Sequence, residues 1–153
     1  MRFTFLILCM NQPINQLARL LRSGWWAGLF LVGAPIALPV QAGPPRVYAW
    51  GDNSNGQTNL PITLTNVVKI AAGYYHGLAL RSNGTVISWG NNLNGQTNNQ
   101  SSLTNVIEIA GGGYHSLALR SNGLVYGWGL NTSGQRTVPA SLNGVKAISA
   151  GST

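Results

Sequence analysis

The sequence predicts an all-β protein made of small antiparallel sheets that stack on one another. Two observations predict this class: a fixed repeat interval of 39 residues, and short apolar runs separated by turn-forming residues within each interval. Self-similarity at a period of roughly 20 to 50 residues is typical of proteins whose structural unit buries its apolar faces only against copies of itself. The repeated part shows no helical spacing of apolar residues, so we expect no helices there.

The repeat needs no gap to align. The heptapeptide from Leu78 to Gly84 returns unchanged as Leu117 to Gly123, and the copies span residues 47–85, 86–124 and a truncated 125–153. A packing role is needed in every copy, whereas a catalytic residue is usually needed once. We therefore predict a structural role for the positions that recur, which are Trp50, Trp89, Trp128, His76, His115, Gly56, Gly95 and Gly134.

Residues 1–42 do not follow the period and are predicted to be a signal peptide with a helical core. They hold three arginines, no acidic residue, an apolar stretch from residue 25 to residue 40, and Ala42 at the expected cleavage position. The stretch is short for a spanning helix, which needs roughly 20 apolar residues. Export would place the chain outside the cell, on its surface or in the periplasm. A retained anchor, and a start at Met10 rather than Met1, stay open as alternatives.

The predicted mature domain, residues 43–153, contains no cysteine, so packing and backbone hydrogen bonds must hold it together. Six basic and two acidic residues give it a net charge of +4, against +7 for the whole chain. The basic residues are scattered singly. Nucleic-acid or anionic-membrane binding calls for a concentrated basic face, so we expect neither partner, and no membrane contact beyond the export signal.

Three apolar runs in each repeat are predicted to be strands; in the first full copy they are 67–72, 76–80 and 85–89. Asn83-Gly84 lies between the last two and predicts a tight hairpin turn with positive φ at both residues. The run that ends in the tryptophan has a small face and a bulky face, so consecutive sheets can interlock. Small sheets buried on both faces favour the radial blades of a β-propeller.

The run from Gly73 to Leu80, Asn83-Gly84, the run from Val86 to Asn91, and Gly95-Gln96 resemble the repeat of the regulator of chromosome condensation family. The resemblance covers residues 47–153. It implies a seven-bladed propeller with a four-stranded antiparallel sheet per blade, of which this chain would hold about 2.7 blades, since its 107 repeat residues are divided by 39. The short repeats are similar to those of bacterial exported members, which include propeller-type β-lactamase inhibitory proteins that bind an enzyme through one rim. Two explanations of the partial propeller stay open: a truncated gene product, or several copies that associate to close a ring.

The sequence gives little support to catalysis. General acid and base work by carboxylates needs a pair at a defined separation, and the mature domain offers only Asp52 and Glu108, in non-equivalent slots of the repeat. The run from Asp52 to Gly56 lacks the downstream glutamate of a calcium loop and is predicted to be a polar turn. The glycines do not form a phosphate-binding run before a helix. We therefore predict a protein that is not an enzyme and holds no cofactor or metal.

Function is expected where the copies differ, because variable loops on a repeated scaffold are where partners usually bind. The candidate binding residues are Asp52, Lys69, Glu108 and Arg136. Unselected sequence change at solvent-exposed positions explains each of them equally well. The preferred function is an exported, non-catalytic module that binds a protein or a cell-surface polymer. The alternative is inhibition of a secreted enzyme such as a β-lactamase. Nucleotide exchange on a small GTPase is the third possibility that the resemblance implies, and an export signal argues against it.

Overall fold

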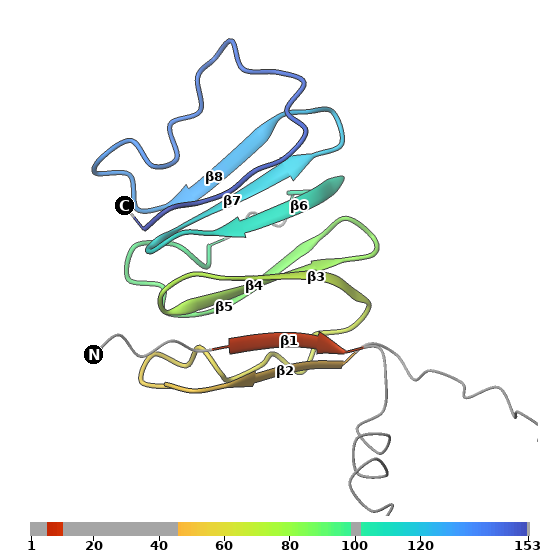
Figure 1. Ribbon diagram of the computed structural model, residues 1–153, viewed down its shortest axis with the longest axis vertical. Helices are drawn as coiled ribbons and strands as arrows, with labels where there is room; N and C mark the ends of the chain where they lie inside the picture. The colour runs from red at the N-terminus through yellow and green to blue at the C-terminus, as the bar shows by residue number, and fades with distance from the viewer. Residues whose placement is uncertain (1–5, 11–45, 99–101, 153) are drawn as a thin grey trace, which may run out of the picture.

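The computed structural model describes residues 6–10, 46–98 and 102–152, and the regular structure in this part of the chain is all β-strand. Three sheets lie one above another (Figure 1), and neighbouring strands in each are antiparallel. This arrangement confirms the predicted all-β partial propeller. The strands are β1 (Leu6–Met10) and β2 (Arg46–Trp50) in the first sheet, β3 (Val67–Ala72), β4 (His76–Arg81) and β5 (Val86–Gly90) in the second, and β6 (Val106–Gly111), β7 (His115–Arg120) and β8 (Val125–Gly129) in the third.

The second and third sheets follow the same plan at an offset of 39 residues. In the second, β4 pairs with β5 from His76 opposite Gly90 to Leu80 opposite Val86. The equivalent residues of β7 and β8 are paired in the same way. Each sheet also has an irregularity at the same place in its first strand, before Lys69 in β3 and before Glu108 in β6. The sequence repeat is therefore a repeat of register, not only of composition.

The first sheet takes one strand from the segment that the sequence predicts to be a signal peptide. In this sheet Leu6 lies opposite Trp50 and Met10 opposite Arg46. Residues 1–5 and 11–42 of the predicted leader lie outside the described residues. The helix predicted for the leader is therefore not confirmed, and the part that is described is a strand.

The second and third sheets contain three strands each, rather than the four that the family resemblance implies. The fourth strand would follow the tryptophan loop, and in the first copy this segment contains Pro61, which has no N–H to donate to a ladder. Pro61 instead accepts a turn hydrogen bond from the amide of Leu64 at 3.0 Å. In the second copy, Ser88 Oγ donates to the carbonyl of Thr97 at 2.7 Å, so Thr97 lies beside β5. The described residues between β5 and β6 add no further strand to this sheet.

The hairpin between β4 and β5 forms where Asn83-Gly84 predicts it, but the turn type is different. Gly84 has a φ of 77°, while Asn83 has no positive φ. The Gly84 amide donates to the Arg81 carbonyl at 2.9 Å, and the Arg81 amide donates to the Thr85 carbonyl at 2.9 Å. This geometry is a turn followed by a left-handed glycine, the form usual for three-residue hairpin loops.

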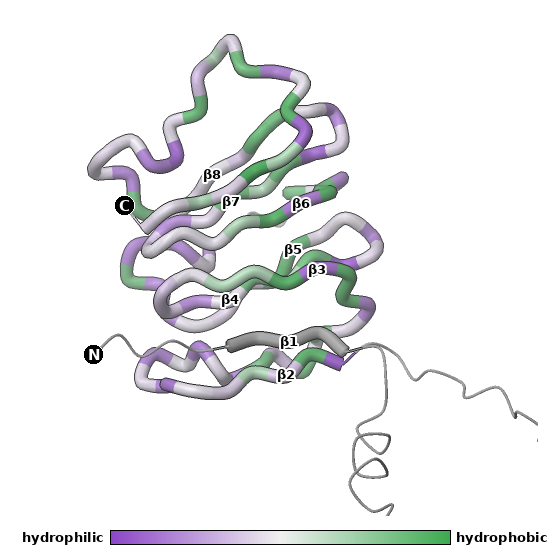
Figure 2. The backbone as a smooth tube through the Cα atoms, viewed as in Figure 1, coloured by the Kyte–Doolittle hydropathy of each residue, from purple (hydrophilic) through white to green (hydrophobic). Residues whose placement is uncertain are grey.

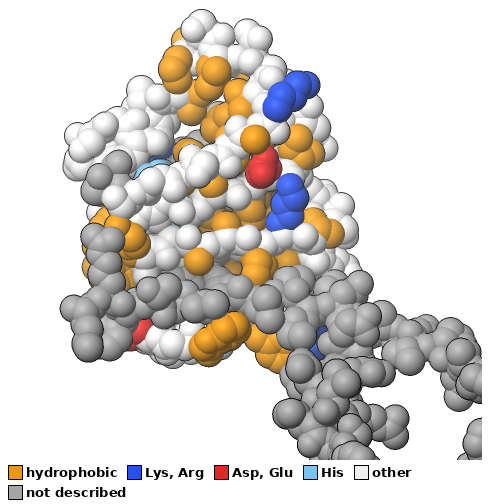
Figure 3. All heavy atoms as spheres, viewed as in Figure 1, with side chains coloured by type: hydrophobic (Ala, Val, Ile, Leu, Met, Phe, Trp, Pro, Cys, Tyr) orange, Lys and Arg blue, Asp and Glu red, His pale blue; other side chains and the backbone are white. Residues whose placement is uncertain are grey.

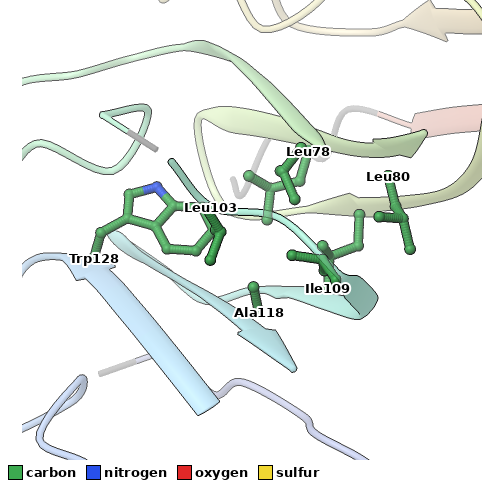
Figure 4. Packing of buried hydrophobic residues seen from close by; sticks show 8 residues of the cluster. Leu78, Leu80, Leu103, Ile109, Ala118 and Trp128 are labelled. Carbon is green, nitrogen blue, oxygen red and sulfur yellow. The ribbon is translucent and has the colours of Figure 1, made fainter. Parts of the chain in front are cut away.

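The hydrophobic core lies mainly between the second and third sheets. Figure 4 shows its members projecting from both sheets toward one another, including Leu78 and Leu80 of β4, Ile109 of β6 and Trp128 of β8. A second cluster forms on the other face of the second sheet around Val67, Ala79 and Trp89. Hydropathy along the chain agrees, because apolar residues concentrate in the strands and polar residues in the loops at both ends (Figure 2).

Candidate functional site

The loops that follow Trp50 and Trp89 are each held by a buried glutamine. Gln57 Nε2 donates to Asp52 Oδ2 at 2.9 Å, and Gln57 Oε1 accepts from the Asn55 amide at 2.8 Å. In the next copy Gln96 makes the same two bonds, with Asn91 Oδ1 in the place of the carboxylate oxygen. Aspartate and asparagine interchange at this position because each offers the acceptor oxygen that the glutamine amide requires.

Asp52 is therefore part of the loop architecture. Its carboxylate also accepts from the backbone amide and the hydroxyl of Ser54, at 3.1 and 2.9 Å. These hydrogen bonds, the backbone bond first, lower the pKa of Asp52 because they favour its ionised form. The structure agrees with the predicted polar turn, whose side chains bond to nearby backbone groups.

The two histidines lie inside the stack of sheets. His76 Nε2 is 2.9 Å from Ser116 Oγ, and that hydroxyl donates to the Gln96 carbonyl at 2.9 Å. The hydroxyl proton is thus engaged, so His76 carries its proton on Nε2 and donates to the serine oxygen. Burial lowers the pKa of His76 to about 4, with a smaller effect from His115, whose own pKa burial also lowers. His76 is neutral at pH 7 and links β4 to the next sheet.

The three tryptophans of the repeat differ in exposure. Trp89 is 6% exposed and Trp128 is 4% exposed, whereas Trp50 is 48% exposed. The indole N–H of Trp89 donates to the carbonyl of Gln57 at 2.8 Å, so the ring faces the preceding loop. Trp50 occupies the equivalent position in the first sheet, and half of its surface stays accessible.

Three tyrosines, which the sequence analysis did not single out, gather at the tryptophan-loop end of the sheets. The ring centroids of Tyr74 and Tyr114 are 5.8 Å apart, those of Tyr75 and Tyr114 are 5.9 Å apart, and those of Tyr74 and Tyr75 are 6.3 Å apart. All three side chains are half-buried. We call these residues the tyrosine cluster. The geometry of two pairs is edge-to-face, which aromatic rings favour.

The tyrosine cluster lies beside the loops that vary between copies. The Tyr75 carbonyl accepts from the amide of Asn91 at 2.8 Å, and the Tyr114 carbonyl accepts from the amide of Leu130 at 2.9 Å. Asn91 and Leu130 occupy the same repeat position as Asp52. The sequence contained two signals for the cluster. A tyrosine directly precedes each histidine, and Tyr74 is a further tyrosine that the next copy does not have. Tyr74 closes the cluster because its counterpart, Gly113, leaves room for the ring.

The four candidate residues from the sequence do not come together. Asp52 and Arg136 lie in loops after β2 and β8, at the tryptophan-loop end. Lys69 and Glu108 lie on β3 and β6, at the irregularities of the first strands. On the face in Figure 3 charged side chains are few, and an acidic one lies beside basic ones, so this face shows no concentrated basic surface.

The described residues offer no group of three histidine, cysteine or acidic side chains that could hold a metal ion. Within residues 6–10, 46–98 and 102–152 there is also no helix with the length and apolarity to cross a membrane. The part of the site that the structure brings together is aromatic and polar. Such a surface is suited to contact a partner, since tyrosine supplies apolar area and a polar tip in one rigid side chain.

Comparisons with known proteins agree with this architecture. Residues 67–96 and 106–135 match the regulator of chromosome condensation (RCC1) repeat. No curated protein sequence matches the chain.

Several solved structures share the fold. Human WBSCR16 is 23% identical with a TM-score of 0.55, and the match covers 70% of this chain and 38% of that one. Prp20p from Saccharomyces cerevisiae is 22% identical with a TM-score of 0.56, over 71% and 37% of the two chains. The ectodomain of the receptor kinase CR4 from Physcomitrella patens is 23% identical with a TM-score of 0.56, over 72% and 32%.

The chain thus spans a little over a third of the length of the first of these structures. At such identities the likeness shows the fold, and the repeat match shows the kind of unit from which the fold is built. The two matched copies, their shared register and the fold of the solved structures show that this chain contains RCC1 repeats, folded as sheets of a β-propeller.

Proposed function

We propose that this chain is an exported, non-catalytic module that binds a protein partner through the tryptophan-loop end of its blades. The observation that carries the proposal is the tyrosine cluster, Tyr74, Tyr75 and Tyr114, which lies next to loops that differ between copies. Aromatic residues, tyrosine among them, are enriched at protein interfaces and in the few positions that dominate binding energy. An RCC1-repeat propeller supports a role in protein interaction.

The likeness to Prp20p supports a protein partner rather than a polymer. The solved structure of that protein is described with its binding to Gsp1p and histones, and a related structure shows the yeast protein with Kap60. Gsp1p, histones and Kap60 are described as partners of the yeast protein. For this chain we infer only the class of partner, because fold alone does not fix function.

The experiment is affinity capture with the full-length chain from the secreted fraction of the organism that encodes it. Tyr75→Ser and Tyr114→Ser should each weaken the captured interaction at least about tenfold, the effect expected when a binding hot spot is truncated. Ile62→Ser is the matched control. Ile62 is an exposed apolar residue at the opposite end of the sheets, close to Thr63, whose carbonyl accepts from Arg81.

If Ile62→Ser abolishes binding while both tyrosine variants keep it, the partner binds the opposite end and the proposed surface is wrong. A captured enzyme is then assayed with and without the chain, because loss of its activity would make the module an inhibitor. N-terminal sequencing of the chain recovered outside the cytoplasm tests export. A new N-terminus at Gly43 is expected, and recovery of the intact chain only from the cytosol contradicts it.

A further inference from the structure

The side chains that an oxidant can modify in the repeated part of the chain are mainly aromatic. Residues 43–153 contain neither cysteine nor methionine, whose sulfur atoms are the usual targets of oxidation. All five tyrosines lie in this range, and three of them, Tyr74, Tyr75 and Tyr114, form the tyrosine cluster. Each of the three is half-buried, so part of each ring stays accessible in the folded protein.

The cluster brings together rings from two consecutive sheets. Tyr75 lies in the loop between β3 and β4 of the second sheet, and Tyr114 occupies the same repeat position between β6 and β7 of the third sheet. The Tyr75 carbonyl accepts from the Asn91 amide at 2.8 Å, and the Tyr114 carbonyl accepts from the Leu130 amide at 2.9 Å. These backbone bonds fix both loops, so the two rings are held near each other across the boundary between the sheets.

The orientation of the rings distinguishes one pair in the cluster. The ring planes of Tyr74 and Tyr114 stand at 81°, so the edge of one ring faces the flat side of the other. The planes of Tyr75 and Tyr114 are inclined by 42°, and their centroids are 5.9 Å apart. From this inclination, small rotations of the two side chains turn a ring edge of Tyr75 toward a ring edge of Tyr114. Such rotations of accessible side chains take picoseconds to nanoseconds.

We propose that Tyr75 and Tyr114 form an oxidative cross-linking site, at which hydrogen peroxide and a haem peroxidase convert the two phenols into dityrosine. Each tyrosine gives up one electron and its hydroxyl proton, and the peroxide takes up both electrons and both protons to become two water molecules. The two phenoxyl radicals then couple through one carbon–carbon bond between ring carbons next to the oxygens. The hydrogens on these two carbons move to the oxygens, so both phenols are restored.

The fold favours this pair over the other tyrosines. Two groups held close within one folded chain react at an effective concentration far above that of separate molecules. Tyr48 and Tyr126 have no ring contact with another tyrosine among the described residues, and Tyr126 lies instead beside Trp128, with ring centroids 6.1 Å apart. Within the described part of the chain, the tyrosine cluster is therefore the place where phenols are already paired.

The new bond joins the second and third sheets covalently. It links positions that are one repeat apart, and a cross-link of this kind restricts the unfolded chain, as a disulfide does. The cross-linked monomer should therefore unfold at a higher urea concentration than the unoxidised chain. The site is independent of the proposed binding function, because the reaction needs no partner protein.

The test treats the full-length chain with hydrogen peroxide and a haem peroxidase at low protein concentration, and then isolates the monomer by size. Dityrosine is detected by its fluorescence and located by tryptic mapping. Trypsin cuts after Lys69, Arg81 and Arg120, so the expected product is residues 70–81 joined to residues 82–120. Its yield in the monomer should not change with protein concentration, because the coupling takes place within one chain.

Phenylalanine variants identify the rings that react. Tyr114→Phe should abolish the linked peptide, because phenylalanine has no hydroxyl to oxidise, and Tyr75→Phe should reduce it to the background of the untreated chain. Tyr126→Phe is the matched control and should leave the yield unchanged. Each substitution keeps the ring that packs in the structure, so the variants retain the fold.

Three outcomes would overturn the site: no linked peptide in the oxidised monomer, the same yield in Tyr114→Phe, or a link that survives Tyr75→Phe and disappears in Tyr74→Phe. Oxidation in urea adds a further control. An equal yield from the unfolded chain would show that the fold does not select this pair, which also contradicts the proposal. Normal cross-linking together with failure to capture any partner would support the site and remove only the proposed binding function.

Discussion

At the scale of single residues, one difference between the copies changes which side chains are hydrogen-bonded between sheets. Gly77 lies beneath the indole ring of Trp89, and a Cβ at this position would meet the ring. In the next copy Ser116 takes the same place, and its hydroxyl donates to the Gln96 carbonyl. The Trp128 indole N–H then has no partner among the described residues. The change from glycine to serine thus exchanges a tryptophan hydrogen bond for a serine bridge to His76.

The buried position of His76 predicts that the protein loses stability in acid. The pKa of His76 is lowered to about 4, below the ordinary value of 6.5, because burial disfavours the charged form. Between these values the unfolded chain binds a proton that the folded chain does not, so stability falls as the pH drops from about 6.5 to about 4. The shift corresponds to about 3 kcal/mol in the free energy of unfolding between pH 7 and pH 4.

Urea denaturation at several pH values checks this expectation. His76→Gln cannot titrate, so its free energy of unfolding should depend less on pH over the same range than that of the unchanged protein. His115 titrates in both proteins and therefore largely cancels in the comparison. Parallel pH dependences for the two proteins would show that His76 is not held neutral.

At the scale of elements, a residue in a left-handed conformation precedes the first strand of the second and third sheets, and the same position recurs one repeat later. Asn66 has a φ of 55°, Asn105 a φ of 57°, and Gly144, at the same repeat position, a φ of 64°. The Asn66 carbonyl accepts from the amide of Ser82, which ties the start of β3 to the hairpin of the same blade. Asparagine and glycine are the residues that tolerate this region, so the side chain is selected by backbone geometry.

Asn105 offers a test of this conformational requirement. Asn105→Gly should change the free energy of unfolding by less than about 1 kcal/mol, because glycine adopts a positive φ without strain. Asn105→Val should lower it by about 1 to 3 kcal/mol, since a β-branched side chain is strained in the left-handed region. Thermal or urea denaturation of the two variants measures the difference. Equal stabilities would show that the backbone relaxes at this position.

At the scale of the whole molecule, stability comes from contact between successive sheets. The main cluster joins β4 of the second sheet to β6, β7 and β8 of the third, with Leu78 and Trp128 among its buried members. Backbone bonds also cross between blades, as when the Val106 amide donates to the Gly84 carbonyl at 3.1 Å. The Val145 amide donates to the Gly123 carbonyl at the same distance, so this link recurs one repeat later.

The tryptophans of the repeat should therefore differ in their contribution to stability according to their place in the stack. Trp89→Ala should lower the free energy of unfolding by about 3 to 5 kcal/mol, because it empties a space between two sheets. Trp50→Ala removes a ring that is 48% exposed and should cost clearly less. Chemical denaturation of both variants checks this order. A larger loss in Trp50→Ala would mean that the ring is covered in solution.

The candidate surface could be predicted only in part. The sequence predicted that function lies where the copies differ, and the structure places two such residues, Asn91 and Leu130, beside the tyrosine cluster. It did not predict that Tyr74, Tyr75 and Tyr114 meet, because two of them belong to one loop and the third lies one blade away. Their approach depends on the rotation between successive blades, which the repeat interval does not encode.

Local patterns in the sequence were sufficient to predict the repeated sheets, the positions of their strands and the residues that face the next blade. These features follow from local patterns: the 39-residue interval, the apolar runs and the Asn-Gly turns. Two features became visible only in the folded chain: residues 6–10 pair with β2, and the described residues after β5 and β8 add no fourth strand to their sheets. Pairing between distant segments is made by backbone groups, which every residue but proline carries in full, so side-chain patterns leave little record of it.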